Sequence, residues 1–165
     1  MAIFEGAGVA IITPMNDDFS INFEKLGAII NDQIEKGTDA IIICGTTGES
    51  STMSHEEHIE CIKYAVEVTK GRVPVVAGSG SNSTAEAIHI SKAAEEAGAD
   101  GLLCVTPYYN KCTQNGLYQY YKDISDAVNI PIIMYNVPSR TGVNILPETA
   151  IEIAKNNKHV KKRSW

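Results

Sequence analysis

Five short apolar segments recur along the chain at nearly equal intervals, and this recurrence restricts the possible folds more than any other feature. They begin at residues 9, 40, 73, 101 and 131, so that successive starts lie 31, 33, 28 and 30 residues apart. Each segment is continuously apolar rather than alternating, which is typical of buried strands in a parallel sheet covered on both faces. The segments are residues 9–13, 40–44, 73–77, 101–105 and 131–137.

Helical patterns with recognisable ends separate these segments. Residues 23–34 carry an apolar stripe that stops before a glycine. Ser54 with Glu57, and Ser83 with Glu86, have the spacing of capping boxes that start two further helices. Two more helices are expected at residues 117–128 and 147–156.

Alternation of strands and helices predicts an α/β fold, as either a doubly wound sheet or a TIM (βα)8 barrel. A doubly wound nucleotide-binding fold would carry a glycine-rich loop after its first strand, where this chain has Thr13-Pro14. The barrel is therefore favoured. A barrel needs about 250 residues, and 165 residues supply only about its first five βα units.

The end of the chain departs from the pattern. Residues 158–165 read Lys-His-Val-Lys-Lys-Arg-Ser-Trp where a sixth apolar strand is due. We expect residues 1–160 to form the partial barrel and residues 161–165 to be an aberrant tail in place of that strand. Loss of the pattern indicates a C-terminal truncation.

Composition excludes several classes of function. The net charge is −6 and the chain has no basic patch, so nucleic acid is a poor partner. No apolar run reaches the roughly 20 residues of a membrane helix, and the start lacks the features of a signal peptide. We expect a cytoplasmic protein whose four cysteines are buried thiols rather than disulfides or zinc ligands.

Hydroxyl groups dominate the carboxyl ends of the predicted strands, where a barrel places its active site. Carboxylates are nearly absent there, so no metal site is expected. The glycine-flanked turn of Thr46 and Thr47 would suit an anion held by backbone N–H groups. Arg140 would recognise a carboxylate, and tyrosines could relay protons.

Each of these signals also has a purely structural interpretation. Residues 78–80 read Gly-Ser-Gly and are mostly structural, because they match neither a dinucleotide fingerprint nor a P-loop. Tyr108 and Tyr109 could simply be a packing pair. His55 and His58, on a first helical turn, would ordinarily be exposed polar residues.

Three motifs in fixed order resemble the dihydrodipicolinate synthase (4-hydroxy-tetrahydrodipicolinate synthase) family of class I pyruvate aldolases. They are residues 45–50 (GTTGES), 106–111 (TPYYNK) and 135–142 (YNVPSRTG). The resemblance implies condensation of pyruvate with L-aspartate 4-semialdehyde through a lysine Schiff base, in lysine and diaminopimelate biosynthesis. No external cofactor is implied.

The resemblance also assigns roles to residues. Tyr135 and Thr46 would form a proton relay that Tyr109 completes from a neighbouring subunit of a homo-oligomer, a tetramer of tight dimers. Thr46 and Thr47 would hold the pyruvate carboxylate, and Arg140 the carboxylate of the semialdehyde. Positions matching the site where feedback-sensitive members bind L-lysine are Ser50, His55, His58, Asn82, Glu86 and Tyr108.

One position departs from the family. The Schiff-base lysine of the sixth strand aligns with Arg163. Imine formation needs a neutral amine, whereas arginine stays protonated. Lys161 and Lys162 are close in sequence, but a strand shifted by one residue turns its side chain to the opposite face. The 165-residue chain is therefore expected to be inactive.

Two other functions stay open. The chain could be a non-catalytic lysine-binding or assembly fragment. It could also be another pyruvate-dependent aldolase of the N-acetylneuraminate lyase superfamily, although Arg140 and the Thr46-Thr47 pair argue against that alternative.

Overall fold

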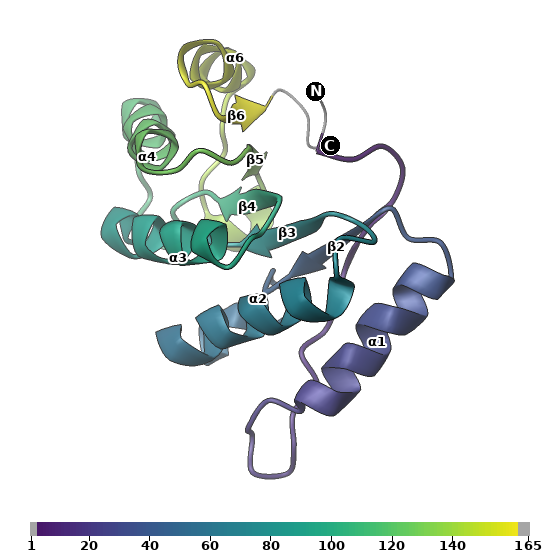
Figure 1. The fold of residues 1–165 in the computed structure, drawn as a ribbon. Coiled ribbons are helices and arrows are strands. Elements are labelled where there is room, and N and C mark those ends of the chain that lie inside the picture. Colours follow the sequence, from purple (N-terminus) through teal and green to yellow (C-terminus); the bar gives the residue numbers. More distant parts are fainter. Residues whose placement is uncertain (1–2, 162–165) are drawn as a thin grey trace.

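The computed structural model describes residues 3–161, which form one parallel sheet flanked by helices (Figure 1). Six strands follow one another in the order β1-β2-β3-β4-β5-β6, and every neighbouring pair is parallel. The strands are β1 (Gly8–Ala10), β2 (Ala40–Ile43), β3 (Val75–Gly78), β4 (Gly101–Val105), β5 (Ile132–Tyr135) and β6 (Val160–Lys161).

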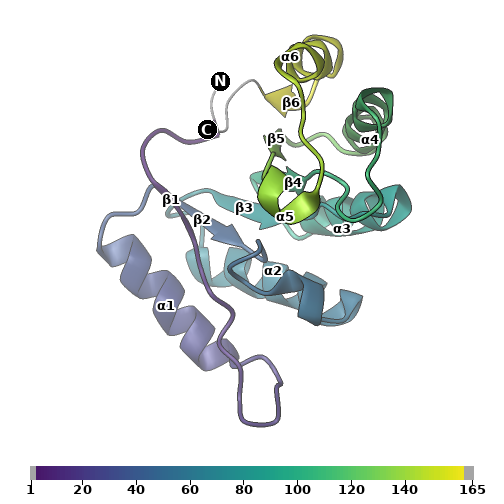
Figure 2. The same ribbon diagram turned by 180° about the vertical axis from the view of Figure 1, so that it is seen from behind.

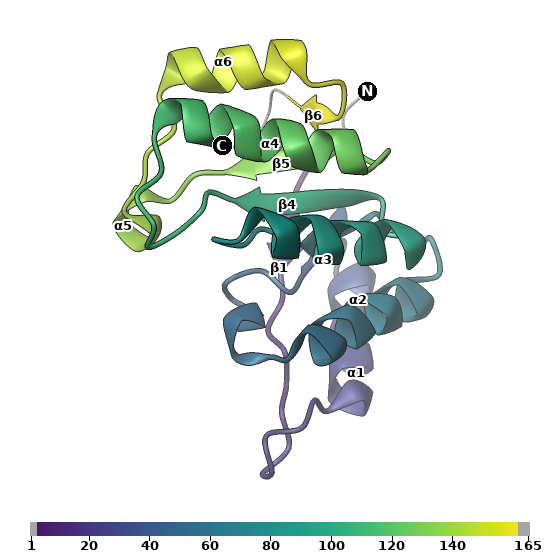
Figure 3. The same cartoon turned by 90° about the vertical axis from the view of Figure 1, so that its left-hand side faces the viewer.

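Five long helices lie along the outer, convex side of the curved sheet (Figures 1 and 3). Figure 2 shows a sixth, short helix between β5 and the last long helix, apart from the row of long ones. The helices are α1 (Phe23–Glu35), α2 (His55–Thr69), α3 (Thr84–Glu96), α4 (Gln114–Ala127), α5 (Pro138–Thr141) and α6 (Pro147–Asn156), with a 3-10 turn η1 (Ser50–Thr52) before α2.

Strand order decides between the two predicted architectures. A doubly wound sheet reverses its strand order at a switch point and carries helices on both faces. Here the order is strictly sequential and the long helices share one face. The prediction of an α/β fold built from the first units of a TIM barrel is therefore confirmed.

Local signals in the sequence located several elements well. β4 and α6 have the predicted bounds. At the start of α2, the Ser54 side chain accepts a hydrogen bond from the Glu57 N–H while the Glu57 carboxylate accepts one from the Ser54 N–H. At the start of α3 only half of the predicted capping box forms. Ser83 accepts from the Glu86 N–H, but the Glu86 carboxylate pairs with His55 instead.

A sixth strand of two residues follows α6, where the sequence analysis expected the apolar pattern to be lost. Val160 pairs with Ile132, and Lys161 pairs with Ile133. Val160 is 3% exposed, and the Ile132 N–H donates to the carbonyl of His159. A strand ladder uses backbone groups, so the charged composition of this segment did not prevent pairing. Residues 162–165 lie outside the described part of the chain.

The core lies between the convex face of the sheet and the long helices. Large side chains there are fully buried, and they come from both layers: Leu26, Ile30, Ile41, Ile43, Ile62, Leu102, Leu117, Ile124, Ile132 and Ile153. The alternate strand residues Ile42, Leu103 and Val105 are only half-buried. Among the described residues, none of the helices combines the length and the apolar character needed to cross a membrane.

Candidate active site

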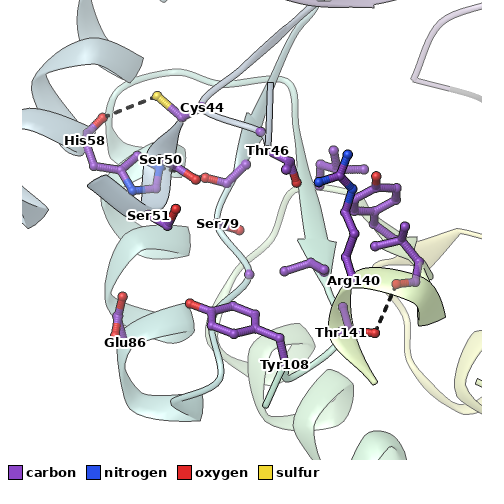
Figure 4. A pocket seen from close by; sticks show the side chains of 17 residues that line it. Cys44, Thr46, Ser50, Ser51, His58, Ser79, Glu86, Tyr108, Arg140 and Thr141 are labelled. Carbon is purple, nitrogen blue, oxygen red and sulfur yellow. Dashed lines mark hydrogen bonds between the residues drawn. The ribbon is translucent and has the colours of Figure 1, made fainter. Parts of the chain in front are cut away.

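A cavity of about 310 Å³ lies at the carboxyl ends of β2, β3, β4 and β5 (Figure 4). This is the end of the sheet at which barrels place their active sites. Its polar lining comes from several separate connections between strands and helices. The residues that line it are Cys44, Gly45, Thr46, Ser50, Ser51, His58, Gly78, Ser79, Gly80, Glu86, Leu103, Val105, Tyr108, Tyr135, Val137, Arg140 and Thr141.

The turn after β2 carries two unused backbone donors, and one of its residues, Thr46, lines the cavity. Gly48 N–H donates to the carbonyl of Gly45 at 3.0 Å, which closes the turn. The hydroxyl of Thr13, which follows β1, donates a 2.7 Å hydrogen bond to the Gly48 carbonyl and stabilises the turn. Within residues 3–161 the N–H groups of Thr46 and Thr47 donate to no other group. Two adjacent free N–H groups in a turn form an anion-binding arrangement.

Close packing of β2 against β3 holds this turn in place. Cys44 adopts a left-handed backbone conformation, with φ of 55°. Its carbonyl oxygen lies so close to Gly78 that a Cβ there would be 2.1 Å from it. The position thus tolerates only glycine. The Gly78 carbonyl also accepts a 2.8 Å hydrogen bond from His58 Nε2.

His58 is a neutral, buried donor in this arrangement. A carbonyl can only accept, so His58 Nε2 carries the proton. Burial lowers the pKa of His58 and outweighs the opposing effect of the bond to Gly78. The sequence interpretation of His58 as an exposed polar residue is therefore wrong, because the ring turns inward against β3 with 9% exposure.

Tyr135 and Arg140 approach the cavity from the β5 side. Tyr135 is the last residue of β5 and pairs with Val105 at the end of β4. Arg140 lies on α5, and its side chain extends toward the Thr46 turn (Figure 4). The Thr141 hydroxyl donates to the Val143 carbonyl at 2.9 Å and holds the end of α5.

The opposite wall carries the acidic group of the site. A Glu86 carboxylate oxygen on α3 lies 3.2 Å from His55 Nε2, and Tyr108 extends toward Glu86 from the segment after β4 (Figure 4). Ser50 and His58 complete this wall. Glu86 is thus an accessible carboxylate beside hydroxyl and imidazole groups.

Not every predicted site residue reaches the cavity. Thr47, Tyr109, His55 and Asn82 do not line it. Tyr109 is 86% exposed and has φ of 70°, and its N–H donates to the Thr141 carbonyl at 3.2 Å. The Asn82 carbonyl accepts from the Asn110 side chain at 2.9 Å. His55 contacts the lining indirectly, through Glu86.

Several lining residues were not predicted as site residues. Cys44 directly precedes the predicted anion-binding turn, and that adjacency was an available signal. Ser51 and Thr141 each neighbour a predicted residue. Ser79 lines the cavity, yet its hydroxyl accepts from Ser91 at 2.9 Å and contacts the Cys104 thiol, in agreement with a structural role.

The cavity lining contributes no lysine from the described residues. Position 163 and Lys162 lie outside the described part of the chain. The backbone register pairs Lys161 with Ile133, two residues before Tyr135. One strand repeat, about 6.6 Å, separates its backbone level from that of Tyr135. Among residues 3–161 there is also no group of three or more His, Cys, Asp or Glu residues that could hold a metal ion.

Residues 3–162 match the family model described as the dihydrodipicolinate synthetase family. A 4-hydroxy-tetrahydrodipicolinate synthase from Lachnoclostridium phytofermentans is 63% identical over 150 residues, which are 91% of this chain and 51% of that protein. The chain thus spans about half the length of the curated relatives it matches.

Solved structures agree with this similarity. The crystal structure of dihydrodipicolinate synthase from Aquifex aeolicus has a TM-score of 0.93 and 46% identity, covering 98% of this chain and 56% of that one. The chloride-inhibited dihydrodipicolinate synthase from Acinetobacter baumannii, complexed with pyruvate, has a TM-score of 0.91 and 49% identity, covering 94% of this chain and 54% of that one.

Proposed function

Because the chain belongs to the dihydrodipicolinate synthetase family, we propose that its cavity is the substrate-binding half of a pyruvate aldolase site. The complete protein would condense pyruvate with L-aspartate 4-semialdehyde through a lysine Schiff base. One observation carries the proposal: Thr46, Tyr135 and Arg140 come from three separate segments and line the same cavity.

The Thr46 turn would bind the pyruvate carboxylate. Its two free N–H groups supply hydrogen-bond donors without a charged side chain. The A. baumannii relative was crystallised with pyruvate, which supports the choice of ligand. Arg140 extends from α5 and can pair with the carboxylate of the second substrate.

Tyr135 would hydrogen-bond the imine and exchange protons with Thr46. Both residues line one cavity, which suits a short relay. Tyr109 would serve the site of a neighbouring subunit in a homo-oligomer. Its 86% exposure and its absence from the cavity lining of its own chain support that role.

The 165-residue chain would form no productive imine. The reaction requires an uncharged primary amine close to the Tyr135 hydroxyl. Arginine occupies position 163, where the family resemblance implies the lysine, and arginine is not deprotonated in proteins.

Lysine binding without catalysis is the second candidate. Glu86, His58, Ser50 and Tyr108 line the cavity wall opposite Arg140. Glu86 could pair with the ammonium group of L-lysine in a charge-assisted contact. Calorimetric titration with L-lysine tests this candidate. Saturable binding supports it, and the absence of binding heat from a folded chain excludes it.

Borohydride trapping tests the catalytic proposal. The chain is incubated with pyruvate and sodium borohydride and digested, and the peptide masses are measured by mass spectrometry. The full-length L. phytofermentans relative is the positive control. We expect a reduced pyruvyl group on the relative and none on this chain. A stable adduct on Lys161 or Lys162 would refute the inactive assignment.

A further inference from the structure

Arg140, which would recognise a carboxylate, has no bond of its own that fixes its side chain. The residue is exposed, and among residues 3–161 its guanidinium forms no hydrogen bond or ion pair. The side chain extends from α5 toward Thr46 (Figure 4). The position of the α5 backbone therefore decides which part of the cavity the guanidinium can reach.

The helix α5 cannot hold this position by itself. It has only four residues, and helices this short are unstable in water without tertiary contacts. The N–H groups of Arg140 and Thr141 both donate to the Val137 carbonyl, at 2.9 and 3.1 Å. These bonds close the helical turn but do not attach it to other segments. The attachment must come from further hydrogen bonds.

Thr141 supplies such an attachment on two sides. It is 3% exposed, and its hydroxyl donates to the Val143 carbonyl at 2.9 Å and accepts from the Val143 N–H at 3.3 Å. Its own carbonyl accepts from the Tyr109 N–H at 3.2 Å. Thr141 thus connects α5 to the residues that follow it and to the segment between β4 and α4.

The Thr141 hydroxyl has no proton left for a ligand, although the residue lines the cavity. A hydroxyl donates one hydrogen bond. The Val143 carbonyl, at 2.9 Å, is the nearer acceptor, and the Val137 carbonyl lies 3.2 Å from the same oxygen. Both are backbone groups at the two ends of α5, so the hydroxyl acts on the helix rather than on a substrate.

We propose that Thr141 is a positioning residue that holds α5 so that Arg140 can bind the carboxylate of the second substrate. The inference rests on the proposed function for the identity of that carboxylate. The placement of α5 is a property of the chain itself, and it can be measured without a ligand.

Backbone order parameters of the isotope-labelled chain test the placement of α5. We expect the Arg140 amide to be rigid in the unchanged chain, with an order parameter of about 0.85, and to fall below about 0.6 in Thr141→Val. Thr141→Ser keeps the hydroxyl and should keep the rigid value. Thr69→Val is the matched control, because Thr69 is also buried but its hydroxyl has no hydrogen-bond partner among the described residues.

A second variant covers the case in which valine prevents folding. Thr141→Ala also removes the hydroxyl, but it leaves space for water at the backbone groups of Val143, and the same loss of rigidity is expected. An Arg140 amide that stays rigid in a folded chain of either variant would overturn the proposal.

Titration with L-asparagine tests the consequence for binding. This amino acid has an amide in place of the aldehyde of L-aspartate 4-semialdehyde, so it keeps the carboxylate without the reactive carbonyl. We expect saturable shifts of the Arg140 Nε–H signal, which is assigned by its loss in Arg140→Lys. The affinity should be about fivefold weaker in Thr141→Val, as expected for one lost hydrogen bond, and unchanged in Thr141→Ser.

Pyruvate separates positioning from a general structural loss. Its effect on the Thr46 and Thr47 amide signals should be the same in the unchanged chain and in Thr141→Val. Equal weakening of pyruvate and L-asparagine would contradict the positioning role. An unchanged chain whose Arg140 signal ignores L-asparagine would count against the proposed function alone, since the order parameters are measured without a ligand.

Discussion

Replacing Gly78 by alanine is expected to destabilise the protein strongly, because the new methyl group meets the backbone of Cys44 and Gly45, directly after β2. A Cβ at this position would lie 2.1 Å from the Cys44 oxygen, 2.7 Å from its carbonyl carbon and 3.0 Å from the Gly45 nitrogen. No side-chain rotation relieves these contacts, so β2 and β3 must separate. Overpacking in a core costs about 1–3 kcal/mol, and loss of the His58 bond to Gly78 adds about 1 kcal/mol.

We therefore expect Gly78→Ala to lower the free energy of unfolding by about 3 kcal/mol. With a urea m-value of about 2 kcal/mol/M, the midpoint falls by about 1.5 M. Gly45→Ala is the matched control, since a Cβ there meets nothing within 4 Å. Urea unfolding followed by circular dichroism measures both variants. Midpoints that agree within about 0.3 M, for an m-value of this size, would refute the packing argument.

Three further substitutions test other features of the fold. Phe19 is 81% exposed with φ of 67°, so Phe19→Gly should stabilise the chain by about 0.5–1 kcal/mol in the same urea assay. Ser54→Ala removes the acceptor of the Glu57 N–H and should cost about 1 kcal/mol. His58 is held neutral when folded, so the unfolded chain takes up a proton first as pH falls below about 6.5. The free energy of unfolding of the wild type should then fall toward pH 5, by up to about 1.4 kcal/mol for each unit by which folding lowers the His58 pKa. The His58→Gln variant lacks this titrating group, so its free energy of unfolding should fall less.

Each of the three has its own control. Phe19→Ala keeps the left-handed strain, and an equal gain from alanine and glycine would contradict the backbone explanation. Ser54→Thr keeps a side-chain acceptor at the helix start and should leave the free energy of unfolding nearly unchanged. A decrease as large as that of Ser54→Ala would contradict the capping explanation. Identical pH dependence of wild type and His58→Gln would show that another group titrates.

Periodicity and capping were sufficient to predict most of the fold. Ser54 and Pro147 mark helix starts through local chemistry, namely a side-chain acceptor and a preset φ. The helix α5 was missed because its four residues are too short to show an apolar period. The strand β6 was missed because Val160 alone carries the apolar signal.

The site residues could be predicted where their position at a strand end determines where they lie in the fold. Strand ends brought Thr46 and Tyr135 to one cavity, as the βα repeat implies. The orientation of His58 could not be predicted, because its position on the helix does not show which group accepts the hydrogen bond from its ring. The half-formed capping box at Ser83 has a similar cause, because the Glu86 carboxylate could bond the start of its own helix or approach His55, and in the structure it lies beside His55.

Titration of the isotope-labelled chain with pyruvate tests the central claim most directly. The account predicts saturable shifts of the Thr46 and Thr47 amide signals, and none of that size with acetone, which has the ketone but lacks the carboxylate. Equal responses to the two ketones, or signals that pyruvate leaves in place on a folded chain, would contradict it.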